Sequence, residues 1–171
     1  MKDDHFFEEL ADEVLKSIDR EAEKLANRVG LIIERETKDV LRQNDKIATA
    51  EMYKGIFFKV RKRILSYFVT ISSNADYSVY VYDGTKPHFP PLNKIVKWVR
   101  IKRMAGRYSI KTKRRMGKKQ DKLDEDKALA WAIAVSISRK GTKGFKFFDL
   151  ALKQALPILE EEVQSFGYSI E

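Results

Sequence analysis

Cysteine is absent from the 171-residue sequence, and histidine and proline are scarce, with two and four copies. A chain without cysteine has no disulfide framework, no thiolate nucleophile and no cysteine-ligated metal. The two histidines, His5 and His88, stand in no H-x-x-x-H or H-E-x-x-H pattern, so we expect no metal site. No loop has the glycine and lysine spacing of a phosphate-binding Walker motif. These absences predict a protein without a cofactor.

Long hydrophobic runs are also missing. No window approaches the roughly 18 continuous apolar residues that cross a bilayer. The first ten residues, MKDDHFFEEL, are acidic, whereas a secretory signal is basic and then apolar. We therefore expect a soluble protein made in the cytoplasm, with no membrane partner.

Acidic residues are lacking from one stretch, Lys94–Lys119, which holds twelve basic residues. The whole chain carries +9, and without this stretch 22 of its 34 basic residues remain against 25 acidic ones. A local basic patch attracts phosphate or an acidic protein surface. We expect a mobile basic loop over residues 105–122. The candidate DNA or partner contacts are Arg103, Arg107, Lys111, Lys113, Arg114, Arg115, Lys118 and Lys119.

The hydrophobic pattern predicts an α+β fold in a single domain spanning residues 1–171. Apolar residues at gaps of three, four and seven predict one long helix over about residues 4–43, with a kink or stop near Gly30. A helix of about 35 residues is roughly 50 Å long. Since this exceeds the diameter of so small a domain, we expect part of the helix to project onto a neighbour.

The middle of the chain is rich in aromatic and β-branched residues. Residues 56–71 predict one strand, or two with a bend, and a turn follows over residues 72–76. Residues 77–82 suit either a short strand or one helical turn. Pro87, Pro90 and Pro91 then fix an extended segment.

Three helices are predicted in the second half. The first spans residues 92–104, and residues 107–120 lack an apolar period and read as a loop or hairpin. Residues 129–138 alternate like a strand, yet their alanines and flanking residues favour a helix buried on most sides. A last helix covers residues 148–164 and should kink at Pro157. The expected fold is a long N-terminal helix, a small antiparallel sheet and C-terminal helices packed on it.

Two segments share a local pattern, Gly84-Thr85-Lys86 and Gly141-Thr142-Lys143, and aromatics follow each. Glycine permits the positive φ that ends a strand or helix, so we interpret both as chain reversals that bring aromatics to one core. Asp83 and His88 form the nearest approach to a catalytic pair, although no nucleophile can be placed beside them.

Together several segments resemble the tail-component family of long-tailed phages, which includes tail-completion and head–tail joining proteins. The segments are YVYDGTKPHFPP (80–91), IVKWV (95–99) and AWAIAVSISRKGTKGF (130–145), then Phe147 and Phe148. Members of that family typically place an acidic residue before Gly-Thr, where glutamate is commoner than the aspartate here. The resemblance covers about residues 77–156. The matching motif residues are Asp83, Gly84, Thr85, Pro87, Pro90, Trp98, Gly141, Thr142, Phe147 and Phe148.

The resemblance implies a structural virion protein in the tail or neck, without catalysis. Its partners would be copies of itself in a ring, and neighbouring connector and tail proteins. We expect Trp98 to pack with residues 87–91 in the core, so that Trp98→Ala loses about 3–5 kcal/mol. The basic loop would face the lumen, near passing DNA, or a neighbouring ring. Two alternatives are an independent nucleic-acid-binding protein that uses residues 94–119, and an enzyme that uses Asp83 and His88.

Overall fold

The computed structural model describes residues 2–44, 50–64, 66–105 and 119–168. These divide into two compact units. Unit 1 comprises residues 1–44, 51–75 and 147–171, and unit 2 comprises residues 45–50 and 76–146. The single domain expected from chain length stays a prediction, because it depends on whether the units unfold together.

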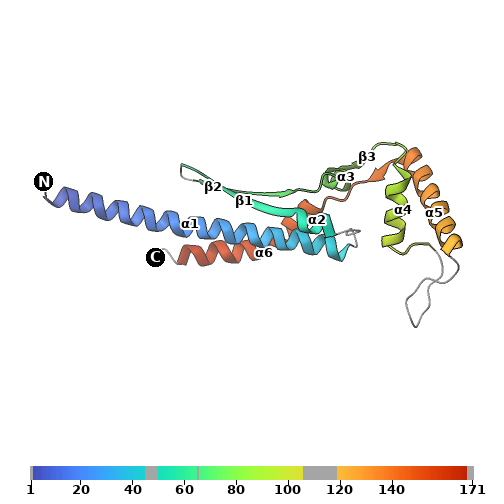
Figure 1. The fold of residues 1–171 in the computed structure, drawn as a ribbon. Coiled ribbons are helices and arrows are strands. Elements are labelled where there is room, and N and C mark those ends of the chain that lie inside the picture. The colour runs from blue at the N-terminus through green and yellow to red at the C-terminus, as the bar shows by residue number, and fades with distance from the viewer. Residues whose placement is uncertain (1, 45–49, 65, 106–118, 169–171) are drawn as a thin grey trace, which may run out of the picture. The chain divides into compact units, whose positions relative to one another are not determined.

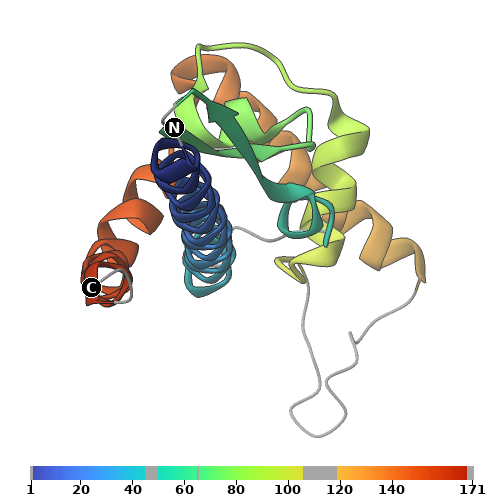
Figure 2. The same cartoon turned by 90° about the vertical axis from the view of Figure 1, so that its left-hand side faces the viewer.

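Unit 1 is organised around one long helix, α1 (Lys2–Gln43). A short helix, α2 (Ala50–Gly55), leads into the antiparallel hairpin of β1 (Ile56–Arg63) and β2 (Ser66–Ser73). The last helix is α6 (Phe147–Tyr168). Helix α1 lies between α6 on one side and the hairpin on the other (Figures 1 and 2). The α+β class, the long first helix and the small antiparallel sheet are thus confirmed, with α6 packed on α1.

Helix α1 continues through Gly30, so the stop predicted there is wrong, and the alternative of a kink stays a prediction. A Cβ atom at Gly30 would lie 2.2 Å from Cδ2 of the Phe58 ring on β1. The missing side chain therefore lets the hairpin approach the helix closely. A tertiary contact, and not a helix end, explains the glycine.

The core of unit 1 joins the end of α1 to the elements that follow it. Among its largest fully buried side chains are Leu41, Met52, Ile56 and Phe147. The hairpin runs in register from Ile56↔Ser73 to Arg63↔Ser66, which settles residues 56–71 as two strands. Serines 72 and 73 belong to β2, so the predicted turn begins two residues later. Helix α6 continues through Pro157, and the kink expected there stays a prediction.

Unit 2 begins with α3 (Ser78–Asp83), which selects the helical alternative for residues 77–82. The two-residue strand β3 (Gly84–Thr85) and an extended segment lead to α4 (Leu92–Ile101). After a stretch outside the described residues come α5 (Lys119–Lys140) and β4 (Thr142–Lys143). The helix favoured for residues 129–138 is confirmed, and it begins early enough to include residues 119–122 of the basic loop predicted over residues 105–122.

Helices α4 and α5 pack against each other through one face each. Val99, Ala105 and Ala130 are buried there, with Ile133 packed beside them. The prediction that residues 129–138 are buried on most sides is wrong, because Trp131 is 55% exposed.

Trp98 is 36% exposed, whereas its neighbour Val99 is fully buried. Successive residues on a helix are separated by about 100°, so burial of Val99 turns Trp98 off the contact face. The placing of Trp98 in the core is therefore wrong. Of the prolines in the segment before α4, Pro90 is buried and Pro87 is exposed.

Candidate functional site

The two Gly-Thr segments pair with each other. Strands β3 and β4 are antiparallel, with Gly84 opposite Lys143 and Thr85 opposite Thr142. The two threonine Oγ1 atoms lie 3.0 Å apart, and the backbone N–H of Thr142 donates to Oγ1 of Thr85 at 3.2 Å. We call this pairing the Gly-Thr clasp. The two segments are thus strands that pair with each other across 57 residues of chain. The expectation that they bring the following aromatics to one core is wrong, because Phe89 is 51% exposed in unit 2 whereas Phe147 is fully buried in unit 1.

Both glycines of the Gly-Thr clasp are required by space and by backbone conformation. Gly84 has φ +79° and ψ −171°, and Gly141 has φ +69°. A Cβ on Gly84 would lie 2.2 Å from the carbonyl oxygen of Thr142, and one on Gly141 would lie 2.0 Å from that of Thr85. Any side chain at either position would push the paired backbones apart.

Asp83 is engaged by a lysine next to the Gly-Thr clasp. Its Oδ1 lies 2.5 Å from Nζ of Lys146, which in turn sits 4.1 Å from the centroid of the Tyr82 ring. His88 contacts the carbonyl oxygen of Lys86 through Nδ1 at 2.9 Å. The acidic residue before Gly-Thr thus ties the two segments together.

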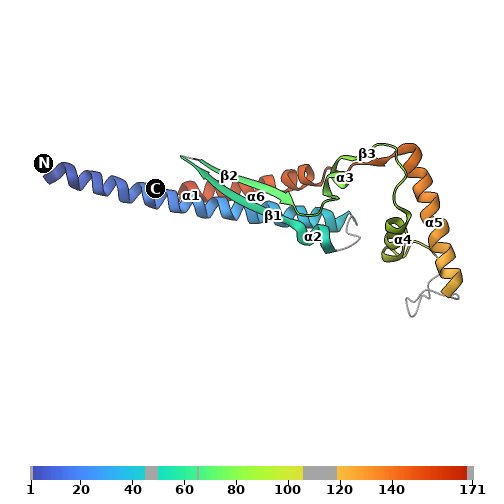
Figure 3. The same ribbon diagram turned by 45° about the horizontal axis from the view of Figure 1, so that its top comes forward.

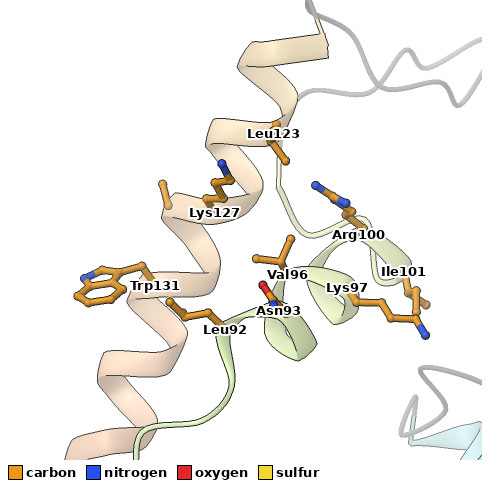
Figure 4. A pocket seen from close by; sticks show the side chains of 10 residues that line it. Leu92, Asn93, Val96, Lys97, Arg100, Ile101, Leu123, Lys127 and Trp131 are labelled. Atoms are coloured by element: carbon orange, nitrogen blue, oxygen red, sulfur yellow. The ribbon is translucent and has the colours of Figure 1, made fainter.

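A groove of about 890 Å³ lies between α4 and α5 (Figure 4). We call it the α4–α5 groove. Leu92 and Val96 project from α4 toward α5, and Leu123 projects from α5. The remaining lining residues are Asn93, Ile101, Ala128 and Trp131, and three basic residues, Lys97, Arg100 and Lys127. An apolar floor with a few charged groups is typical of a binding site.

One of the three basic residues is neutralised. Nε of Arg100 donates to Oδ2 of Asp126 at 2.9 Å, and the Asp126 side chain is only 4% exposed. Within the described parts of the chain, Lys97 and Lys127 have no carboxylate within 4 Å. The α4–α5 groove therefore offers two uncompensated positive charges beside apolar side chains.

The aromatic side of α5 is exposed at one end of this groove. The Trp131 ring stands edge-on to Phe89, with centroids 5.5 Å apart and planes at 60°. Phe89 is 51% exposed, so this pair presents a large apolar surface.

The N-terminal half of α1 carries a second exposed apolar surface. We call it the α1 stripe; it consists of Leu10, Val14, Leu15 and Ile18, which are 46%, 49%, 62% and 39% exposed. Leu10 precedes Arg28 by eighteen residues, or about five helical turns, so both lie on the same side of α1. Nε of Arg28 contacts Oε2 of Glu162 on α6 at 2.9 Å. The α1 stripe thus continues the side of α1 that faces α6.

Helix α6 is too short to cover the α1 stripe. The two helices run antiparallel, and α1 extends past the end of α6 (Figure 3). Tyr168, the last described residue of α6, follows Glu162 by six residues. Both helices rise by the same distance per residue, so Tyr168 lies level with about Ala22 of α1. The α1 stripe lies on the N-terminal side of Ala22 and is therefore not covered by α6.

The hairpin is fastened to α1 by a charged cluster around Asp19. The Tyr67 hydroxyl donates to Oδ1 of Asp19 at 2.8 Å, and Nζ of Lys62 pairs with Oδ2. These hydrogen bonds, from Lys62 first and then Tyr67, lower the pKa of Asp19 below its ordinary value of 3.8. The same bond to Asp19 raises the pKa of Lys62.

Six of the eight predicted basic contacts fall in the part of the chain that the structure does not describe. Arg107, Lys111, Lys113, Arg114, Arg115 and Lys118 lie outside the described residues. Lys119 is the first residue of α5. Arg103 is exposed and lies two residues after the end of α4. Its backbone is left-handed, with φ +52°, and the N–H of the next residue, Met104, donates to Val99 O at 3.1 Å. This position has a structural role that glycine usually fills.

Sequence reasoning missed the α4–α5 groove, the Lys146 partner of Asp83 and the Asp126 partner of Arg100. Each joins residues from separate segments, so local spacing carries no signal for it. The only hint was that Lys94, Lys97 and Arg100 recur every third residue, as on one helix face. Within the described ranges, no group of three His, Asp or Glu side chains could hold a metal ion. No described helix is long and apolar enough to cross a bilayer.

No protein-family model, curated protein or solved structure matches this chain.

Proposed function

We propose that this chain is a non-enzymatic structural protein of a tailed-phage virion. It acts in tail completion or head–tail joining by forming a ring with copies of itself, which contacts neighbouring connector and tail proteins. The single observation that carries the proposal is the α1 stripe, an apolar helix side that continues past its intramolecular partner. Contiguous apolar surface of this kind on a soluble protein usually marks an interaction site.

The motif residues support a structural role for the part of the chain that resembles phage tail components. Gly84, Thr85, Gly141 and Thr142 form the Gly-Thr clasp, and Asp83 is bound by Lys146 beside it. Phe147 is fully buried and Phe148 packs on its ring, with centroids 4.4 Å apart. These residues have packing and pairing roles, as expected if the motif specifies a fold.

Electron microscopy of a phage lysate after deletion of the gene tests the proposal. We expect filled heads and separate tails, or tails with abnormal ends, because the ring that joins or completes them is missing. Complementation with the wild-type gene should restore joined particles. Normal infectious virions from the deletion strain would refute the proposal.

The second candidate function is non-specific nucleic-acid binding by the basic stretch at residues 94–119. Lys97 in this stretch favours it, since no carboxylate within the described ranges neutralises it. It predicts DNA binding by the lone protein that weakens steeply with salt, because each phosphate contact releases counterions. Neutralising Arg114, Arg115, Lys118 and Lys119 together should leave the fold intact and weaken assembly or DNA contact. Unfolding of that variant would instead give these residues a structural role.

A further inference from the structure

We infer that the α4–α5 groove of one copy receives the N-terminal half of α1 from a second copy. This inference rests on the proposed function and names the surfaces through which the copies associate. It follows from three properties of the described residues: the spacing of their side chains, their charge and the asymmetry of the contact.

The spacing of side chains matches between the two surfaces. On α4 the residues that line the α4–α5 groove recur every fourth position, at Leu92, Val96 and Arg100. On α5 the same interval separates Leu123, Lys127 and Trp131.

The α1 stripe presents a matching row, Leu10, Val14 and Ile18, in steps of about 6 Å. Ridges of residues four apart are those that most often interdigitate where helices pack. An amphipathic helix that lays such a row into an apolar groove is a recurring mode of recognition.

The charges are complementary as well. Residues 8–18 contain four acidic residues, Glu8, Glu9, Asp12 and Glu13, and one basic residue, Lys16. The α4–α5 groove is flanked by Lys97 and Lys127, which lack a carboxylate partner within the described ranges. An acidic helix with an apolar side therefore suits a basic groove with an apolar floor.

Charge also decides against two other occupants. Pairing the α1 stripe with that of a second copy would bring two segments of net −3 together, and like-charge contacts oppose association. A nucleic-acid backbone would match Lys97 and Lys127, but it would leave the apolar floor of Leu92, Val96 and Leu123 unmatched. The N-terminal half of α1 satisfies both the charge and the apolar surface.

The contact is heterologous, because its two sides are different surfaces of the same chain. Each copy carries one donor helix and one acceptor groove, so every copy can contact two others. A heterologous contact closes into a ring when its rotation allows, and otherwise continues as a filament. The inferred surfaces therefore supply the kind of contact that a ring requires.

The absence of cysteine makes the inference directly testable, because engineered thiols have no competitors. One copy carries Leu10→Cys, Val14→Cys or Ile18→Cys, and a second copy with a different affinity tag carries Asn93→Cys. Asn93 lines the α4–α5 groove and is exposed, so the change leaves the core intact. We expect at least one mixture to form a disulfide between differently tagged copies on oxidation. Lys16→Cys, on the far side of α1 from the stripe, is the matched control and should not link.

Charge reversal provides the second arm. Lys97→Glu with Lys127→Glu should lower the association constant measured by light scattering about tenfold or more. Adding Asp12→Lys and Glu13→Lys should restore part of the loss. Circular dichroism of each variant should match that of the wild type, because all four side chains lie on the surface.

The outcomes separate this inference from the proposed function. Copies that associate, but without cross-links from the stripe and without an effect of charge reversal, would overturn the inferred surfaces and leave self-assembly standing. Disulfides formed only between copies that carry the same tag would also overturn it. A protein that stays monomeric at all concentrations would refute both the inference and the proposed self-assembly. Charge reversal that abolished DNA binding and spared association would assign the α4–α5 groove to nucleic acid.

Discussion

Replacing Gly84 by alanine tests whether the Gly-Thr clasp is needed for unit 2 to fold. Gly84 has φ +79° and ψ −171°, a region that glycine alone occupies readily and that costs other residues about 1–3 kcal/mol. The new Cβ would lie 2.2 Å from the carbonyl oxygen of Thr142 and 2.6 Å from the amide nitrogen of Gly144. Both are backbone atoms, which cannot swing aside as the end of a side chain can.

The chain can relieve that overlap only by separating β3 from β4. Separation would lose the threonine hydrogen bonds of the Gly-Thr clasp, at about 0.5–1.5 kcal/mol each. We therefore expect Gly84→Ala to lower the free energy of unfolding by about 3 kcal/mol, or more than a hundredfold in the folding equilibrium.

Tryptophan fluorescence reports this loss selectively. The chain has two tryptophans, Trp98 and Trp131, and both belong to unit 2. At a urea dependence of about 1 kcal/mol per molar, the midpoint should fall by about 3 M.

Two glycine variants serve as controls. Gly167→Ala should be neutral or slightly stabilising, because nothing lies within 4 Å of its Cβ position in α6. Gly144→Ala tests the effect of steric overlap in the absence of left-handed backbone strain. Its φ is not in the left-handed region, yet its Cβ would lie 2.6 Å from Tyr82 O. A wild-type midpoint in Gly84→Ala would refute the requirement for the Gly-Thr clasp.

Three further predictions follow from single side chains. Arg103→Gly should raise the urea midpoint of unit 2 by the equivalent of about 1 kcal/mol, because glycine relieves a left-handed residue at the end of α4; a lower midpoint would contradict this. The Asp19 carboxyl should titrate below 3.8 by NMR and return toward that value in Lys62→Met. Its contribution to stability should be complete above pH 3.8 and disappear as the pH falls through the lowered pKa. Phe147→Ala should lose about 3–5 kcal/mol of stability by circular dichroism, because Phe147 is fully buried. Trp98→Ala should lower the free energy of unfolding by much less than Phe147→Ala does. An equal loss in both variants would contradict the partly exposed position of Trp98.

The elements of this fold were predictable wherever the pattern along the chain is local. The apolar period of α1, the aromatic and β-branched composition of residues 56–71 and the helix signals around residues 129–138 each depend on near neighbours. The predictions that failed depend on contacts far along the chain. Gly30 is a glycine because Phe58 packs on it, and Val99 takes the buried place expected for Trp98.

The candidate site was less predictable than the fold. The two Gly-Thr segments were interpreted as chain reversals, and nothing local indicates that they form strands that pair across 57 residues. The α4–α5 groove depends on how two helices pack, and its apolar residues look like ordinary core positions in sequence. The α1 stripe was visible as part of a helical period, whereas its exposure follows only from where α6 ends.

The Gly-Thr clasp makes the chain between Thr85 and Thr142 an interchangeable module. The strand that leads into this segment and the strand that leads out lie side by side, and Phe145 N–H donates to Val81 O at 2.8 Å just beyond them. The module has its own small core around Val99 and Ala130. Doubling the length of a closed loop adds only about 0.6 kcal/mol of closure entropy. Evolution can therefore lengthen, shorten or exchange this segment, and the two short strands will still hold its ends together.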